Sequence, residues 1–161
     1  MSTPLHTSLA LLFAELIDGA PPDAAYMLNG GDPGLLQSLD KLSAAAASSV
    51  PPSGGASIAA HVDHVRYGLE LMNRWSEGEA NPWSSADWTA SWRRTTVGEE
   101  QWAALRDQLR GQARRWHAAL QTPRPMSALE QNGVISSIAH LAYHLGAIRQ
   151  IDRSIRGPQA S

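Results

Sequence analysis

Four amphipathic segments, separated by proline and glycine breaks, constrain the fold of this chain more than any other feature. Within each segment apolar side chains recur every three or four residues, the period of one face of an α-helix. The segments cover residues 4–18, 57–77, 98–120 and 132–156. A long connection joins the first two and holds a short, weak helical pattern over residues 35–47, which the run Pro51–Gly55 ends. No stretch shows convincing strand alternation, so we predict an all-α four-helix bundle with a long connection between the first two main helices.

Composition limits the classes of function. At 161 residues we expect one domain, residues 1–161, with a sizeable core. The chain has no cysteine, which excludes disulfides, thiolate ligands and a cysteine nucleophile. A net charge of −2 gives no reason to expect nucleic acid or a membrane as partner. The apolar run Leu9–Ile17 carries Glu15 and follows no basic residue, so it is a poor signal peptide and too short to span a bilayer. We therefore expect a cytoplasmic protein.

The last segment places two histidines where core residues would stand. Its inward-facing positions at helical spacing are Ser137, His140, His144, Ile148, Ile151 and Ile155. Residues four apart lie about 40° apart on a helix that turns roughly 100° per residue, so both imidazoles can point at one ion. A buried imidazole needs a hydrogen-bond partner or a metal. Without cysteine, a metal here is held by histidine, carboxylate and water, which suits zinc, nickel, iron or manganese.

A second histidine pair, His61 and His64, lies in the second segment. The apolar arc of that segment puts His61 near its middle and His64 near its edge, beside Trp75 and Gly68. Periodicity alone leaves the choice between them open and slightly favours His61. Asp63 points away from His64 on a helix, so we expect it at the surface.

Three further features have two interpretations each. Tyr143 is about 100° from His144 around the helix, so we expect it to pack between helices rather than act as an acid. Gly68, one turn after His64, leaves room above a metal or allows close helix packing. The six tryptophans pack the core and loops, or line an apolar pocket.

Several classes of site lack their residues. No Glu-x-x-His occurs, which leaves a ferritin-like di-iron site unsupported. The sequence also lacks a His-Glu-x-x-His metalloprotease motif and a glycine-rich phosphate loop. No basic face interleaved with aromatic residues favours nucleic acid.

The order and spacing of several motifs resemble the DinB/YfiT-like family across nearly the whole chain. The matching features are Ser57-Ile58 leading to His64, the tryptophan-rich connection, Trp102, and the His-x-x-Tyr-His-x-Gly-x-Ile element at residues 140–148. The resemblance implies a four-helix bundle, often dimeric, with a divalent metal held by His64, His140 and His144. The sequence departs from the family at Ala147, where glutamine is frequent. That departure removes any polar contact made from this position but leaves the ligand set intact.

Three histidine ligands leave coordination positions open, as expected of a catalytic site. Family members include thiol-dependent transferases, a thiol-dependent isomerase and hydrolases. We therefore expect an enzyme that activates a water or a low-molecular-weight thiol at zinc or nickel and acts on a small molecule, with thiol transfer favoured over hydrolysis by analogy. The alternative is a non-catalytic bundle with a structural or sensing role. A carboxylate that orients the ligands is expected but not identified. His61 has four possible roles: a fourth ligand, a hydrogen-bond partner of a ligand, a proton shuttle or part of a pocket wall. We prefer the last.

Overall fold

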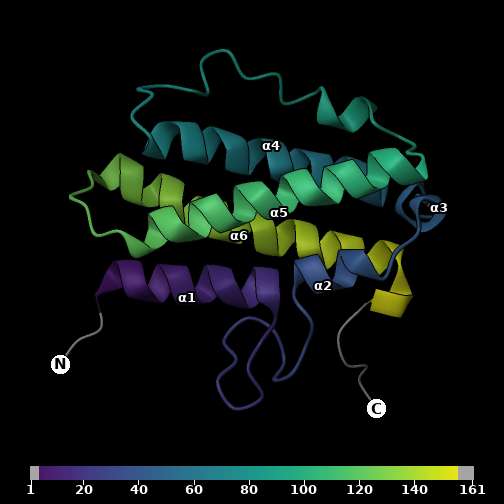
Figure 1. Cartoon of the computed structure of the whole chain (residues 1–161), viewed down its shortest axis with the longest axis horizontal. Helices are drawn as coiled ribbons and strands as arrows, with labels where there is room; N and C mark the ends of the chain where they lie inside the picture. Colours follow the sequence, from purple (N-terminus) through teal and green to yellow (C-terminus); the bar gives the residue numbers. More distant parts are fainter. Residues whose placement is uncertain (1–3, 156–161) are drawn as a thin grey trace.

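Four long helices lie side by side in the computed structural model, which describes residues 4–155 (Figure 1). They are α1 (Leu5–Asp18), α4 (Ile58–Ser76), α5 (Glu99–Gln121) and α6 (Ala128–Ile151). Shorter helices are α2 (Leu35–Asp40), α3 (Ala44–Ala47) and the 3-10 turns η1 (Ser91–Arg93) and η2 (Arg153–Ile155). Within residues 4–155 the only strand-like feature is one isolated bridge between Gly19 and Pro33. The predicted all-α helical bundle is confirmed.

The order of the helices around the bundle requires one long crossover. Helix α4 packs against α5 and α6, and α1 packs against the same two, so α1 and α4 occupy opposite corners. Helices α4 and α5 run in the same direction: the Ser57 hydroxyl, at the start of α4, donates to the carbonyl of Arg94 shortly before α5, and Glu77, just after α4, pairs with Arg115 in the last third of α5. The chain must therefore return along the bundle between them (Figure 1). Residues 77–98 make this return, and we call them the crossover strap.

Local capping signals set where the helices begin. The Ser57 hydroxyl accepts the backbone N–H of Ala60 at 3.2 Å, so the predicted start of α4 is confirmed. Helix α6 begins earlier than predicted, because Ser127 and Glu130 form a reciprocal capping box ahead of Ala128.

Two further predictions of helix extent differ from the structure. The weak helix over residues 35–47 is two helices, α2 and α3, because the chain turns at residues 41–43 and Ser43 caps α3. The last long helix ends at Ile151, and Ile155 is buried from η2 instead. Arg156, the predicted end, lies outside the described residues.

Two tryptophans of α5 lie in the bundle core and donate hydrogen bonds to neighbouring segments. Trp102 and Trp116 are almost wholly buried. The indole N–H of Trp102 donates to the carbonyl of Leu42 at 2.8 Å, and that of Trp116 donates to the Ser137 hydroxyl at 3.0 Å. Each indole thus buries its apolar rings without leaving its polar atom unpaired. Of the helices in residues 4–155, none has both the length and the apolar character needed to cross a membrane.

Candidate metal centre

Three histidine side chains converge between α4 and α6. Helix α4 contributes His64, and α6 contributes His140 and His144 from successive turns of one face. The Nε2 atom of His140 lies 2.9 Å from Nε2 of His144 and 3.2 Å from Nε2 of His64. One ring nitrogen from each residue lies within 4.8 Å of the other two. The structure therefore brings the three predicted ligands together, with His64 rather than His61 supplying the third nitrogen.

Burial keeps these rings uncharged. His144 is 2% exposed and His64 is 8% exposed, while His140 is half-buried. Burial, with a smaller effect of His140, lowers the pKa of His144 to about 3 and that of His64 to about 4. Burial also lowers the pKa of His140. At neutral pH the cluster therefore presents neutral imidazoles, the form that binds a metal.

Two further side chains hold the outer nitrogens of the rings. Nδ1 of His64 lies 3.1 Å from the Ser91 hydroxyl, and that hydroxyl can donate its own proton to the carbonyl of Trp88 at 3.5 Å. With the hydroxyl donating in this way, Nδ1 of His64 carries the proton and its Nε2 keeps a lone pair. Nδ1 of His144 lies 2.8 Å from Nδ1 of His61. Ser91 and His61 thus take the positions in which partners of metal-bound histidines are found.

The inner nitrogens fit a metal ion better than they fit one another. A ring nitrogen carries one proton or one in-plane lone pair, so Nε2 of His140 cannot make linear hydrogen bonds to both neighbours. Two nitrogens on a tetrahedral ion with bonds of about 2.0–2.1 Å lie about 3.3 Å apart. The separations of 2.9 and 3.2 Å are close to that spacing. A cation that accepts all three lone pairs satisfies the cluster.

Asp63 contradicts the sequence prediction. It was expected at the surface, yet it is 7% exposed and pairs with Arg66 and Arg94, each through Nε at 2.8 Å. Burial acts to raise the pKa of Asp63, but the hydrogen bonds from Arg94 and Arg66 outweigh it and lower that pKa. Arg94 belongs to the crossover strap, so Asp63 fastens the strap to α4 beside the cluster instead of orienting a ligand.

Two other predictions about the neighbours of the cluster need correction. Tyr143 is 70% exposed on the outer face of α6, so the prediction that it packs between helices is wrong. His61 was expected at a pocket wall, but it contacts His144 and is absent from the cavity lining. The structure makes His61 a hydrogen-bond partner of His144, a predicted ligand.

Tryptophans of the crossover strap cover the cluster. The Trp92 ring stacks on His64 with centroids 4.3 Å apart, and its edge contacts His61. Trp88 lies against His64 with centroids 5.6 Å apart. Trp83 and Trp88 also line a cavity, while Trp102 and Trp116 fill the core. The tryptophans therefore fill both roles that the sequence left open.

A cavity of about 460 Å³ opens onto the cluster between α4, α6 and the crossover strap. Its lining consists of His64, Val65, Gly68, Leu69, Met72, Trp83, Trp88, Gly133, Ser136, Ser137, His140 and Leu141. A Cβ atom on Gly68 would lie 3.7 Å from Cε1 of His140 and 3.9 Å from the Trp88 ring. The missing side chain of Gly68 thus leaves space beside a candidate ligand, and the cluster is accessible from this side.

Comparisons with known proteins give one match. A family model described as the DinB superfamily matches residues 33–148, which include the three converging histidines and the whole crossover strap. No curated protein and no solved structure matches the chain.

Proposed function

Because the chain belongs to the DinB superfamily, we propose that it is a metal-dependent enzyme whose divalent ion is held by His64, His140 and His144. The observation that carries the proposal is the convergence of three neutral ring nitrogens beside an accessible cavity. Three nitrogen ligands leave a fourth position of a tetrahedral site for water or substrate, as in catalytic zinc sites. Among the ions that imidazole ligands suit, we propose zinc or nickel.

The bound ion would supply a Lewis acid that lowers the pKa of a water or a low-molecular-weight thiol. The residues of the chain supply orientation. Ser91 accepts the Nδ1 proton of His64, and Nδ1 of His61 accepts the Nδ1 proton of His144. Trp92 and Trp88 cover the rings and limit access of bulk water from the strap side. The reacting small molecule enters through the cavity beside Gly68.

By family analogy we propose transfer of a thiol to an electrophile ahead of hydrolysis. The same analogy carries the proposal of a homodimer. A cytoplasmic location stays a prediction from the sequence.

One observation favours a second candidate function. The cluster joins α4 to α6, so a metal there would also clip these two helices together, with the crossover strap held to His64 through Ser91. In a non-catalytic protein this clip would be the whole role of the site. The two functions differ in whether loss of a ligand abolishes turnover or only lowers stability.

Elemental analysis of protein purified without an affinity tag or added metal tests the proposal. We expect about one equivalent of a divalent transition metal per chain, lost in His64→Ala and in His144→Ala. His117→Ala is the matched control, because it removes an imidazole from α5 that belongs to no ligand group. A metal-free parent that also takes up neither zinc nor nickel on titration contradicts the proposal. With metal bound, consumption of a free thiol by an aryl electrophile separates transfer from the structural clip.

A further inference from the structure

The cavity beside the cluster is an elongated cleft with one chemically distinct end. Its α4 wall runs from His64 to Met72, a rise of about 12 Å along a helix axis at roughly 1.5 Å per residue. Helix α6 runs the opposite way, so Gly133 lies toward the Met72 end and His140 toward the His64 end. A volume of about 460 Å³ is within the range of small-molecule sites, about 300–1,000 Å³. A molecule that fills the cleft therefore has one end at the histidines and its body along the helices.

The walls of the cleft carry no ionic partner for a ligand. No Asp, Glu, Lys or Arg is among the lining residues, and the two histidines are the ones whose inner nitrogens converge. The body of the cleft is formed by Val65, Leu69, Met72, Leu141 and the two strap tryptophans. Burial of an unpaired charge against such walls is strongly unfavourable. Away from the histidine end, where the proposed ion would lie, the part of a ligand that fills the cleft is therefore uncharged.

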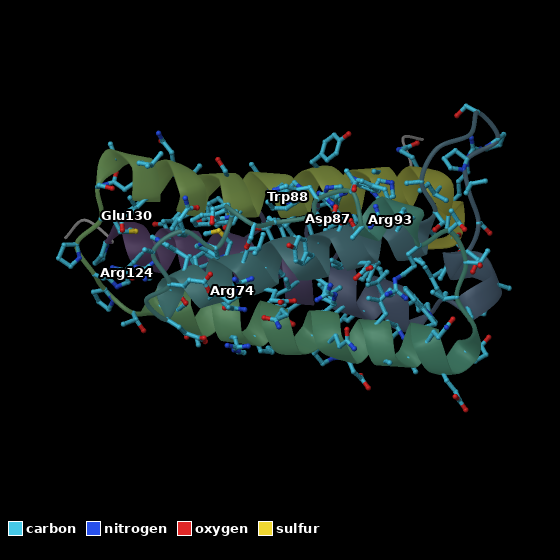
Figure 2. All side chains as sticks on the ribbon, turned by 90° about the horizontal axis from the view of Figure 1, so that it is seen from above. Arg74, Asp87, Trp88, Arg93, Arg124 and Glu130 are labelled. Atoms are coloured by element: carbon cyan, nitrogen blue, oxygen red, sulfur yellow. The ribbon has the colours of Figure 1, made fainter. Side chains whose placement is uncertain are left out.

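Charged side chains near the cleft are engaged elsewhere. Figure 2 looks down on the crossover strap and shows Trp88 between the ribbons of α4 and α6, with Asp87 and Arg93 beside it. Asp87 and Arg93 pair with each other at 3.0 Å. Toward the other end, Arg124 lies over the Trp75 ring at 4.0 Å from its centroid. None of these groups reaches the lining of the cleft.

Aromatic and polar features of the lining narrow the ligand further. Trp88 and Trp83 present ring surface to the cleft, and aromatic rings favour aromatic partners by offset or edge contacts. The Ser137 hydroxyl is already used, since it donates to the carbonyl of Val134 and accepts from Trp116. The Ser136 hydroxyl has no partner among the hydrogen bonds of the described residues and lies one turn before His140. It offers one polar contact near the histidine end.

We propose that this cleft binds a neutral, largely aromatic molecule, with its polar reactive group at the His64 and His140 end and its apolar body between Trp88, Leu69 and Met72. The role of the polar group rests on the proposed function, whereas the binding of the apolar body does not. Any charged part of a co-substrate stays outside the cleft.

Two dyes with the same aromatic skeleton test the selectivity. N-phenyl-naphthylamine is neutral, and anilinonaphthalene sulfonate adds one negative charge. Fluorescence titration should show one site for the neutral dye, with affinity at least about tenfold higher than for the sulfonate. Comparable affinity for the sulfonate would overturn the proposed ligand class.

A matched pair of glycine substitutions tests the location. In Gly68→Leu the Cβ atom fits at ordinary contact distances and the rest of the side chain fills the cleft. In Gly111→Leu the same change is made in α5, where no atom lies within 4 Å of the added Cβ. Gly68→Leu should weaken binding of the neutral dye at least about tenfold and Gly111→Leu should leave it unchanged. Unchanged binding in Gly68→Leu would place the dye elsewhere and overturn the proposal.

Titrations of metal-loaded and chelator-treated protein separate this inference from the proposed function. Tight binding of the neutral dye to a chain that takes up no metal would contradict the proposed metal-dependent function and support the cleft as an apolar binding site. Normal metal uptake with no selectivity for the neutral dye would leave the enzyme standing and overturn the ligand class.

Discussion

The two long connections of the bundle are each fastened to a helix by a buried polar side chain, but in different ways. Glu15 of α1 is 3% exposed, and its carboxylate accepts the backbone N–H groups of Tyr26, Met27 and Leu28 at 2.6–3.1 Å. His64 of α4 receives one partner from the crossover strap, Ser91, and its other nitrogen faces two more imidazoles. The carboxylate is satisfied within the chain and has a structural role. The imidazole has a hydrogen-bond partner on one side only, as the proposed metal site requires.

The largest expected effect is a loss of stability in acid that comes from the buried histidines at the strap. In the folded, metal-free chain the pKa of His64 is lowered from 6.5 to about 4 and that of His144 to about 3. The unfolded chain therefore takes up protons first as the pH falls, so stability is full above about pH 6.5 and declines from there toward pH 3. Denaturant titrations from pH 7 to 4 on metal-free protein measure this slope. It should be shallower in His144→Ala and unchanged in His117→Ala; equal slopes in all three would contradict the prediction.

Removal of the carboxylate should have the next largest effect. Glu15→Ala leaves three backbone N–H groups without their acceptor, and we expect a loss of about 3 kcal/mol in the free energy of unfolding. Metal content should not change. Glu15→Gln keeps one oxygen acceptor and should cost less, about 1 kcal/mol. Urea denaturation gives both values, and a loss of metal in Glu15→Ala would break the distinction between the two anchors.

Ser91→Ala tests the contact between the crossover strap and His64. The change removes the acceptor for the Nδ1 proton of His64, and loss of such a partner lowers metal affinity by about 10- to 100-fold. The metal-free chain should also lose about 1 kcal/mol in the free energy of unfolding, because the buried Nδ1–H of His64 loses its acceptor. Ser85→Ala, in an exposed part of the same strap, is the control. Competition with a chromophoric zinc chelator measures the affinity; equal values for the two variants would mean that Ser91 does not support the site.

The smallest effects are expected from alanine at two glycines, one beside each connection, and they should change the free energy of unfolding in opposite directions. Gly19 adopts φ of +111°, and a Cβ there would lie 2.6 Å from the carbonyl oxygen of Asp32, so Gly19→Ala should destabilise the chain by about 1–2 kcal/mol. Gly68 lies inside α4 with room for a Cβ, so Gly68→Ala should stabilise it by up to about 1 kcal/mol. Thermal unfolding of both variants decides the point. Destabilisation by Gly68→Ala would mean that this glycine is required for helix packing rather than for the cleft.

Much of the fold could be predicted from the spacing of apolar residues and from the proline and glycine breaks, because each of the four long helices buries one apolar face. The division between α2 and α3 could not, since residues 41–43 contain neither glycine nor proline. The start of α6 was predictable in principle: Ser127 and Glu130 have the spacing of a capping box.

For the site, spacing alone paired His140 with His144. It did not choose between His61 and His64, because residues three apart on α4 both face α6. The resemblance implied His64, whose Nε2 does point into the cluster. Ser91 and the burial of Asp63 depend on how the crossover strap passes over α4. No local pattern in the sequence encodes that path.

The parallel arrangement of α4 and α5 has a consequence for how such a protein can diversify. The return segment that it demands supplies one wall of the cleft, the cover of the histidines and the hydroxyl that orients His64. These contributions are separate from the helix interfaces that hold the bundle together. Surface connections accept substitutions and insertions more readily than packed helices. Substitutions in the crossover strap can therefore change which ligand the cleft binds and how tightly a metal is held, while the helix interfaces stay the same.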